Sequence, residues 1–223
     1  LLIEISMGFS QNINFNKVLV PEEAAITVIT SISQDQMGNI WCSLGGTGLF
    51  QFDGTHFKMY MHEDFNPASL ANNRVECIYA DKQGNIWVGT FGSGLDKFDP
   101  STGTFTHYKH DPQDPSSISG DSVTCILEDA EGILWVGTIF TGLERMDPKT
   151  GKFTHYRHQD NDPTSLSFDQ VRAIYEDKQG VLWIGTGSNV TNNENESKKG
   201  GLNHYNKKTG RFTRYLHDEN NPQ

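Results

Sequence analysis

The residues of this chain that could bind a metal ion recur at matching places in four repeats. Histidines stand at His62, His110, His158 and His217. They are about one repeat apart, too far to share one ion. An Asp-x-x-Gly turn also recurs, but it lacks the alternating carboxylates and final Glu of a calcium loop. We therefore predict no metal site and no cofactor, and assign the histidines to hydrogen bonds at strand ends.

A second set of residues could recognise a sugar. Phe91 and Phe140 offer rings that could stack on a sugar ring, and polar side chains near them could supply hydrogen bonds. The candidate ligand-binding residues are Arg74, Phe91, Ser93, Phe140, Thr141, Arg172 and Asn189. They lie where the repeats differ from one another, as a binding site on a repeated scaffold requires. Ordinary surface also varies in this way, and that is the alternative interpretation.

The composition of the chain excludes some classes of protein. Its 223 residues carry a formal net charge of −10, and no run of Lys or Arg exceeds the pair Lys198–Lys199. Because nucleic-acid binding needs a basic patch, we predict no nucleic-acid partner for this region. Cys42, Cys77 and Cys125 form no Cys-x-x-Cys pair and are expected to be small buried apolar residues.

One ten-residue sequence recurs four times and defines the repeat. "DKQGNIWVGT" begins at Asp81, and close relatives of it begin 46 residues earlier and 48 and 96 residues later. The shared positions are Asp35, Asp81, Asp129 and Asp177, then Gly38, Gly84, Gly132 and Gly180, then Trp41, Trp87, Trp135 and Trp183. A catalytic motif needs one copy, so four copies indicate architecture, and we assign structural roles to these residues.

Each repeat is predicted to form four short strands. In the second unit these are "VECIYAD", "NIWVGT", "GLDKFD" and "TFTHYKH". Their β-branched and aromatic residues favour strands, and the Asp-x-x-Gly turn places a glycine where φ can be positive. No segment has the 3.6-residue apolar period of a helix, so we expect helices to be absent or trivial.

Four-stranded units of this length are typical of the blades of a β-propeller. Both faces of the first two strands are largely apolar, as expected for a sheet held between two others. A two-layer sandwich would leave one polar face on each strand. We therefore predict an all-β fold, a β-propeller of four-stranded antiparallel blades, in which each tryptophan packs between blades and its N–H finds an acceptor.

The sequence predicts a partial ring of four blades plus one lone closing strand. The units span residues 29–60, 75–108, 123–156 and 171–215, and the fourth carries an insertion at 187–200. "NFNKVLV" resembles a fourth strand, so residues 13–20 are assigned to the closing outer strand. Residues 216–223 correspond to the start of a linker, and we infer a parent protein with further blades. Residues 1–12 are either a signal-peptide remnant or an ordinary strand or disordered lead.

The repeated pattern resembles the two-component regulator propeller repeat family. The resemblance rests on V-x-x-I-x-x-D-x-x-G-x-(I/L)-W-(V/I)-G-T, then G-L-x-x-(F/M)-D and F-x-x-Y-x-H, with linkers such as "DPSSI" and "DPTSL". The first unit departs from it, with "CSLGGTG" in place of "VGTFGSG". The resemblance implies seven-bladed propellers in the periplasmic or extracytoplasmic sensor region of a membrane-anchored hybrid sensor kinase that controls polysaccharide use. Kinase chemistry is assigned to no residue of this region.

The candidate ligand-binding residues are expected on one face of the propeller. The loops between second and third strands share that face with the connections between blades, around the central channel. The insertion at 187–200 belongs to it and is about eleven residues longer than the equivalent loops, as binding loops often are. The expected ligand is an oligosaccharide. The alternative interpretation of the insertion is a surface loop that is tolerated without a binding role.

Three functions remain open from the sequence. The first is a ligand-sensing module that signals to the remaining blades and signalling domains of its parent chain. The second is a scaffold that binds other proteins, including a second copy in a homodimer. The third is a propeller lyase or glycosidase, which would need an acid and a base converging on the channel face. No such pair stands out on these loops, so we predict that the region is not an enzyme.

Overall fold

The computed structural model describes residues 28–188 and 200–217, and these residues form sixteen strands and no helix. The first two sheets contain β1 (Ile29–Gln34), β2 (Ile40–Leu44), β3 (Leu49–Phe52), β4 (Phe57–Tyr60), β5 (Val75–Ala80), β6 (Ile86–Thr90), β7 (Leu95–Asp99) and β8 (Thr104–Tyr108). The other two contain β9 (Val123–Glu128), β10 (Leu134–Thr138), β11 (Leu143–Asp147), β12 (Lys152–Tyr156), β13 (Val171–Glu176), β14 (Leu182–Gly187), β15 (Gly200–Asn206) and β16 (Arg211–Tyr215). Within this part of the chain, no helix could cross a bilayer.

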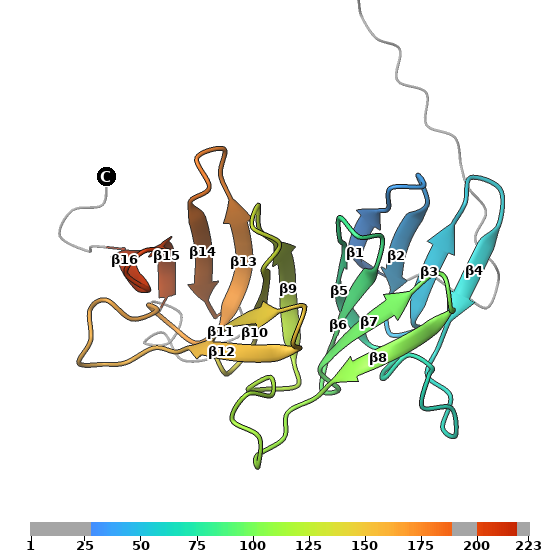
Figure 1. The fold of residues 1–223 in the computed structure, drawn as a ribbon, viewed down its shortest axis with the longest axis horizontal. Helices are drawn as coiled ribbons and strands as arrows, with labels where there is room; N and C mark the ends of the chain where they lie inside the picture. Colours follow the sequence, from blue (N-terminus) through green and yellow to red (C-terminus); the bar gives the residue numbers. More distant parts are fainter. Residues whose placement is uncertain (1–27, 189–199, 218–223) are drawn as a thin grey trace, which may run out of the picture.

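Four consecutive strands form each sheet, and every neighbouring pair is antiparallel. The first strand of each sheet contacts the first strand of the next, in the order β1, β5, β9 and β13. Figure 1 shows the sheets in an arc, with these first strands toward its inside and β4, β8, β12 and β16 at its outside. The chain is therefore all-β and forms a partial propeller, as predicted, and the described residues do not close a ring.

Several predicted segments lie outside the described residues. They are the lead at 1–12, the closing strand at 13–20, most of the insertion at 187–200 and most of the linker at 216–223. The lone closing strand thus stays a prediction from the sequence.

The Asp-x-x-Gly turn and the tryptophan after it form one hydrogen-bonded unit in each sheet. In the second sheet, Asp81 Oδ1 accepts the amides of Gln83 and Asn85 at 2.9 and 2.8 Å. Asp81 Oδ2 accepts the indole N–H of Trp87 at 2.8 Å, and Gly84 has a φ of 87°. The other three sheets repeat the Asp–Trp bond at 2.8–2.9 Å. The acceptor for each tryptophan is therefore the aspartate of its own turn.

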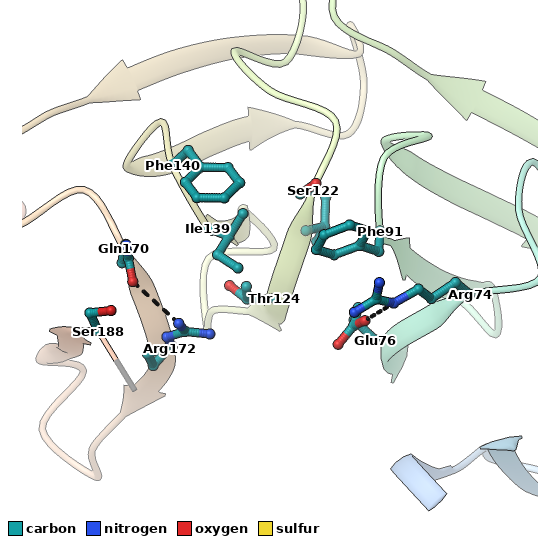
Figure 2. Close-up of a pocket in the computed structure, with 11 residues that line it drawn as sticks. Arg74, Glu76, Phe91, Ser122, Thr124, Ile139, Phe140, Gln170, Arg172 and Ser188 are labelled. Atoms are coloured by element: carbon teal, nitrogen blue, oxygen red, sulfur yellow. Dashed lines mark hydrogen bonds and ion pairs between the residues drawn. The ribbon is translucent and has the colours of Figure 1, made fainter. Parts of the chain in front are cut away.

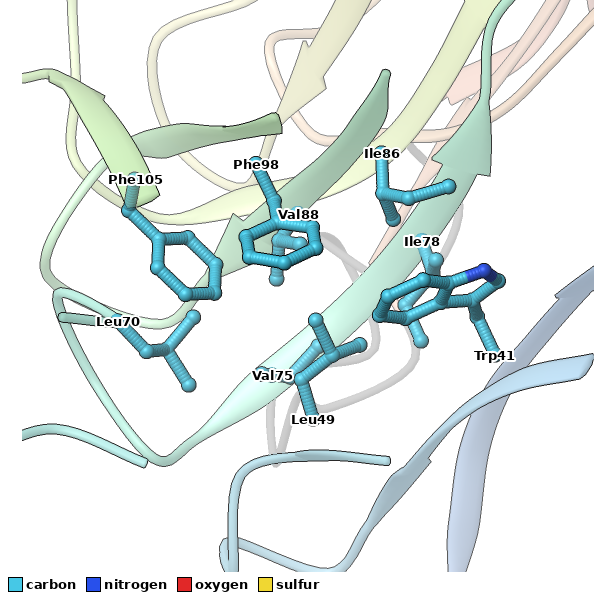
Figure 3. Packing of buried hydrophobic residues seen from close by; sticks show 9 residues of the cluster. All are labelled: Trp41, Leu49, Leu70, Val75, Ile78, Ile86, Val88, Phe98 and Phe105. Carbon is cyan, nitrogen blue, oxygen red and sulfur yellow. The ribbon is translucent and has the colours of Figure 1, made fainter. Parts of the chain in front are cut away.

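Apolar side chains from facing sheets form the core between each pair of sheets. Between the first two, Trp41 and Leu49 pack against Val75, Ile78 and other residues of the second sheet (Figure 3). The corresponding core between the second and third sheets contains Trp87, Leu95, Val123, Leu134, Val136 and Met146. That between the third and fourth contains Trp135, Leu143, Val171, Leu182, Ile184 and Phe212. Burial of this apolar area is the main force that holds each sheet on the next.

Glycine in the second strand allows two sheets to approach closely. A Cβ on Gly89 would lie 2.4 Å from Cys77 Sγ and 2.6 Å from Val123 Cγ1, in the next sheet. Gly137 has the same place in the third sheet, where a Cβ would lie 2.7 Å from Val171 Cγ1. The recurring "VGT" and "IGT" of the repeat therefore reflect packing between sheets as well as strand formation.

Buried polar groups anchor the linkers that lead to β5 and β9. Asp96 in β7 accepts the Ala71 amide at 2.7 Å, and its other oxygen lies 2.7 Å from His107 Nδ1. His107 Nε2 donates to the Pro67 carbonyl at 2.8 Å. In the third sheet Glu144 takes the place of Asp96 and contacts both Ser119 and His155. Burial raises the pKa of Asp96 and of Glu144.

Candidate functional site

A cavity of about 470 Å³ lies where three successive sheets meet at the starting ends of their first strands. The second sheet and its linker contribute Arg74, Glu76 and Phe91. The third contributes Thr124, Ile139 and Phe140, and the fourth contributes Gln170 and Arg172. Figure 2 shows Arg74 and Arg172 on opposite sides of Thr124, with Phe91 and Phe140 farther along the same opening. Loops after second strands and connections between sheets form this site together.

A β-bulge at the start of each first strand sets the side chains that enter the cavity. The register shifts between Val75 and Cys77, and again at the equivalent points of β9 and β13. The residues within these shifts are Glu76, Thr124 and Arg172, one in each sheet. Bulges commonly redirect a side chain beside a binding site. Three chemically different side chains are therefore presented at one structural position.

Threonine is the simplest occupant of this bulge position. The hydroxyl of Thr124 donates to the Val171 carbonyl of the next sheet at 2.6 Å. Thr30, in the first sheet, donates to the Val75 carbonyl in the same way at 2.7 Å. A carboxylate cannot donate such a bond, and the Glu76 side chain instead accepts one from Arg74. A threonine at the bulge position therefore has a structural role. A glutamate there does not make that bond, and its side chain can contact other groups.

Arg74 lies over Phe91 and beside Glu76. Its Cζ is 3.7 Å from the centroid of the Phe91 ring, a cation–π arrangement. Its Nε donates to Glu76 Oε1 at 2.9 Å. One face of the Phe91 ring is therefore covered by Arg74. Phe140 is 65% exposed and offers the more accessible ring for stacking.

Arg172 is held by groups of its own sheet on the opposite side. Its Nε donates to the Gly187 carbonyl at 3.1 Å, and Nη2 donates to Gln170 Oε1 at 3.2 Å. These bonds orient the guanidinium toward Thr124, as Figure 2 shows. Two guanidinium groups from separate sheets thus border one opening.

The structure brings together four of the predicted ligand-binding residues: Arg74, Phe91, Phe140 and Arg172. Ser93 and Thr141 do not line the cavity. Ser93 Oγ accepts Asn72 Nδ2 at 3.2 Å, and Thr141 Oγ1 lies 2.9 Å from Thr138 Oγ1, so both support loop geometry. Asn189 lies outside the described residues.

The candidate set from the sequence omits several cavity residues. Glu76 and Thr124 are equivalent in the repeat to Arg172, and that equivalence is the signal that could have added them. Ile139 precedes Phe140 in the same loop, but an isolated apolar residue gives no sign of a binding role. Gln170, next to the start of β13, is marked only by its variation among the repeats.

Three of the four recurring histidines hold linkers in place. The Nδ1 atoms of His62, His110 and His158 lie 2.8–2.9 Å from the carbonyls of Leu70, Ile118 and Leu166, respectively. Among the described residues, no group of three or more His, Cys, Asp or Glu side chains is placed to hold a metal ion. The thiols of Cys42, Cys77 and Cys125 are free, and burial raises the pKa of Cys125 to about 12.

Three segments of the chain match a family model described as the two component regulator propeller. They are residues 69–92, 117–140 and 165–188. Each runs from a linker through the first two strands of a sheet to the loop beyond, and so includes residues of the cavity. The chain therefore carries two component regulator propeller repeats, which confirms the resemblance drawn from the sequence. No curated protein matches the chain in sequence.

Solved structures with the same architecture include an extracellular domain and two enzymes. The extracellular domain assigned to the hybrid two component system BT3049 from B. thetaiotaomicron has a TM-score of 0.60 and 28% identity, over 85% of this chain and 30% of that one. Virginiamycin B lyase from Staphylococcus aureus has a TM-score of 0.56 and 16% identity, over 84% of this chain and 55% of the lyase. Tricorn protease has a TM-score of 0.55 and 14% identity, over 88% and 18%. The two enzymes are similar in fold alone.

Taken together, the repeats and the 28% identical structure give the class of the chain. It is a propeller module similar to the extracellular domain of a hybrid two component system. The chain spans less than a third of the BT3049 domain that it matches.

Proposed function

We propose that the chain is the ligand-sensing propeller module of a bacterial two-component signalling protein, located outside the cytoplasm. In this proposal it recognises a carbohydrate-like ligand in the cavity and takes part in relaying that binding across the membrane. The observation that carries the proposal is the composition of the cavity. Its polar lining comes from positions at which the three repeats differ, such as Glu76, Thr124 and Arg172.

The cavity has the chemistry expected of a sugar site. A sugar ring presents apolar C–H faces and polar edges, so its sites combine an aromatic ring with hydrogen-bonding side chains. Phe140 supplies an accessible ring, and Arg74, Gln170 and Arg172 supply polar groups around the same opening. A volume of about 470 Å³ is within the usual range for a small-ligand site.

The proposal treats the chain as a binding module without catalysis. General acid–base chemistry on a glycosidic bond needs two groups that can exchange protons. Among the described cavity residues there is one carboxylate, Glu76, and it already accepts a hydrogen bond from Arg74. The extracytoplasmic location is supported by the similar structure, which is an extracellular domain.

The first experiment is a thermal-shift screen of the chain against neutral and acidic oligosaccharides, followed by calorimetry on those that stabilise it. Phe140→Ala is expected to weaken binding about tenfold by removing the stacking ring. Phe65→Ala is the matched control, because Phe65 is 99% exposed and lies outside the cavity. Chromatography of each glycan after incubation tests catalysis. The proposal fails if no glycan binds, if Phe140→Ala binds as well as the parent, or if products appear.

A further inference from the structure

Three backbone amides at the rim of the cavity already donate hydrogen bonds within the protein. The Phe91 amide donates to the Arg74 carbonyl, the Ile139 amide to Ser122, and the Gly187 amide to Gln170, each at 3.0 Å. These three amides are not open to a ligand, and side chains supply further donors in the lining. The richest donors there are the guanidinium groups of Arg74 and Arg172, which carry no acceptor atoms.

These two arginines also give the cavity a charge opposite to that of the chain. The chain as a whole has a formal net charge of −10. The described cavity residues include two arginines and one carboxylate, Glu76, so the lining is positive by one unit. A positive, partly enclosed opening in an acidic protein concentrates anions locally.

Both arginines are held in defined orientations beside the cavity. Stacking on Phe91 and the bond from Nε to Glu76 fix the plane of the Arg74 guanidinium. The two terminal nitrogens of Arg74 make no hydrogen bond within the described part of the chain. Arg172 is oriented from the other side by Gly187 and Gln170. A guanidinium held in this way binds planar or tetrahedral oxyanions with little further loss of entropy.

We propose that the cavity takes an acidic oligosaccharide, with a carboxylate or sulfate group bound between Arg74 and Arg172. An adjacent sugar ring then lies against Phe140, which is exposed in the same opening. This inference rests on the proposed function and narrows it to one class of sugar. The preference for an acidic sugar follows from the guanidinium donors and the positive charge of the cavity lining.

The test compares matched acidic and neutral ligands of the same length. One arm uses oligogalacturonate and its methyl ester, and a second uses a sulfated galactan oligosaccharide and its desulfated form. Calorimetry on the chain is expected to show binding of at least one acidic member that exceeds its neutral partner about tenfold or more. That affinity should fall as salt is raised. The two arms distinguish carboxylate from sulfate.

Single substitutions then assign the effect to the cavity. Arg172→Gln is expected to lower the affinity for the acidic ligand about tenfold or more, with little change for the neutral one. Because Arg172 also bonds backbone, Arg74→Gln serves as a second variant that is less tied to folding. Glu76→Gln keeps an acceptor for Arg74 and removes a negative charge, so it should raise the affinity roughly threefold to tenfold.

A control and three outcomes separate this inference from the proposed function. Asp64→Asn changes net charge by the same unit but lies outside the cavity, and should leave the affinity unchanged. Preferential binding of neutral glycans, lost in Phe140→Ala, would overturn the acidic-ligand inference and keep the sugar-sensing proposal. A drop in affinity in Glu76→Gln would also overturn it. Binding of neither acidic nor neutral glycans would overturn both.

Discussion

The third and fourth sheets share one sequence pattern but differ in how their tryptophans are buried. Trp135 is fully buried and packs against Tyr205 and other side chains of the fourth sheet. Trp183 makes the equivalent Asp–Trp hydrogen bond but is only half-buried. Beside it, Tyr175 and Tyr215 are 61% and 50% exposed. The repeat therefore specifies the hydrogen bond locally, whereas a neighbouring sheet supplies the burial.

The aspartates of the two turns, Asp129 and Asp177, also differ in their contacts with other sheets. Asp129 Oδ2 lies 3.0 Å from Lys207 Nζ, which also lies 3.0 Å from Glu176 of the fourth sheet. Asp177 keeps the hydrogen bonds from Trp183 and the Val181 amide, and no ion pair is seen for it among the described residues. Identical turns thus contribute differently according to what packs on them.

The largest expected difference comes from removing each tryptophan. Trp135→Ala should lower the free energy of unfolding by roughly 3–5 kcal/mol, because it opens a large cavity between two packed sheets. Trp183→Ala should cost roughly 1–2 kcal/mol, since part of that side chain is already in water. Urea unfolding followed by circular dichroism measures both. Equal losses would show that the Asp–Trp hydrogen bond, rather than inter-sheet packing, dominates.

The next comparison uses the glycines of the second strands. Gly137→Ala places a methyl 2.7 Å from Val171 Cγ1 and 2.4 Å from Cys125 Sγ, and overpacking of this kind costs about 1–3 kcal/mol. In Gly185→Ala the nearest atom to the new Cβ is 3.7 Å away, so less than about 0.5 kcal/mol is expected. Thermal denaturation of the two variants tests this. If Gly185→Ala lost as much stability, the glycine would be needed by the strand itself.

The smallest effect concerns pH. Burial opposes the ionisation of Asp129, but hydrogen bonds from Trp135 and Ile133 and the charge of Lys207 hold its pKa below the ordinary value. A carboxyl whose pKa is lowered on folding adds stability above its unfolded pKa, and that stability is lost as pH falls through the folded pKa. Asp129→Asn should therefore cost about 1 kcal/mol near pH 7 and progressively less below about pH 4.

Asp177→Asn is the matched control for that pH effect. Hydrogen bonds from Trp183 and the Val181 amide also lower the pKa of Asp177. Asp129 is paired with Lys207, whereas no described lysine is paired with Asp177. Its substitution should change stability less near neutral pH. Unfolding curves measured from pH 3 to 7 decide the matter, and parallel curves for Asp129→Asn and the parent chain would contradict the assigned role of the ion pair.

The strands and turns could be predicted from the sequence because their causes are local. Short apolar runs, β-branched side chains and the glycine of the Asp-x-x-Gly turn act within a few residues of one another. Gly84, for example, has the positive φ that its turn requires. The repeat also predicts how the sheets are arranged, because a sheet with two apolar faces must lie between two others.

The candidate site could be predicted only in part. Propeller geometry predicts that the loops of Arg74, Phe91, Phe140 and Arg172 lie on one face, and these four residues line one cavity. Ser93 and Thr141 lie in the same loops, yet their side chains support loop structure. Loop position predicts the face on which a residue lies, but side-chain direction depends on bulges and on hydrogen bonds to other segments.

By itself, the sequence determined the repeat, its strands and turns, and a propeller built of four-stranded sheets, because these follow from periodic local chemistry. Only the tertiary structure decided which partners meet across sheets. It placed Arg74 over Phe91, brought the bulge positions of three sheets around one cavity, and left Trp183 half-buried where Trp135 is enclosed. Such contacts join residues tens of positions apart, and their energies depend on distances that a local pattern does not contain.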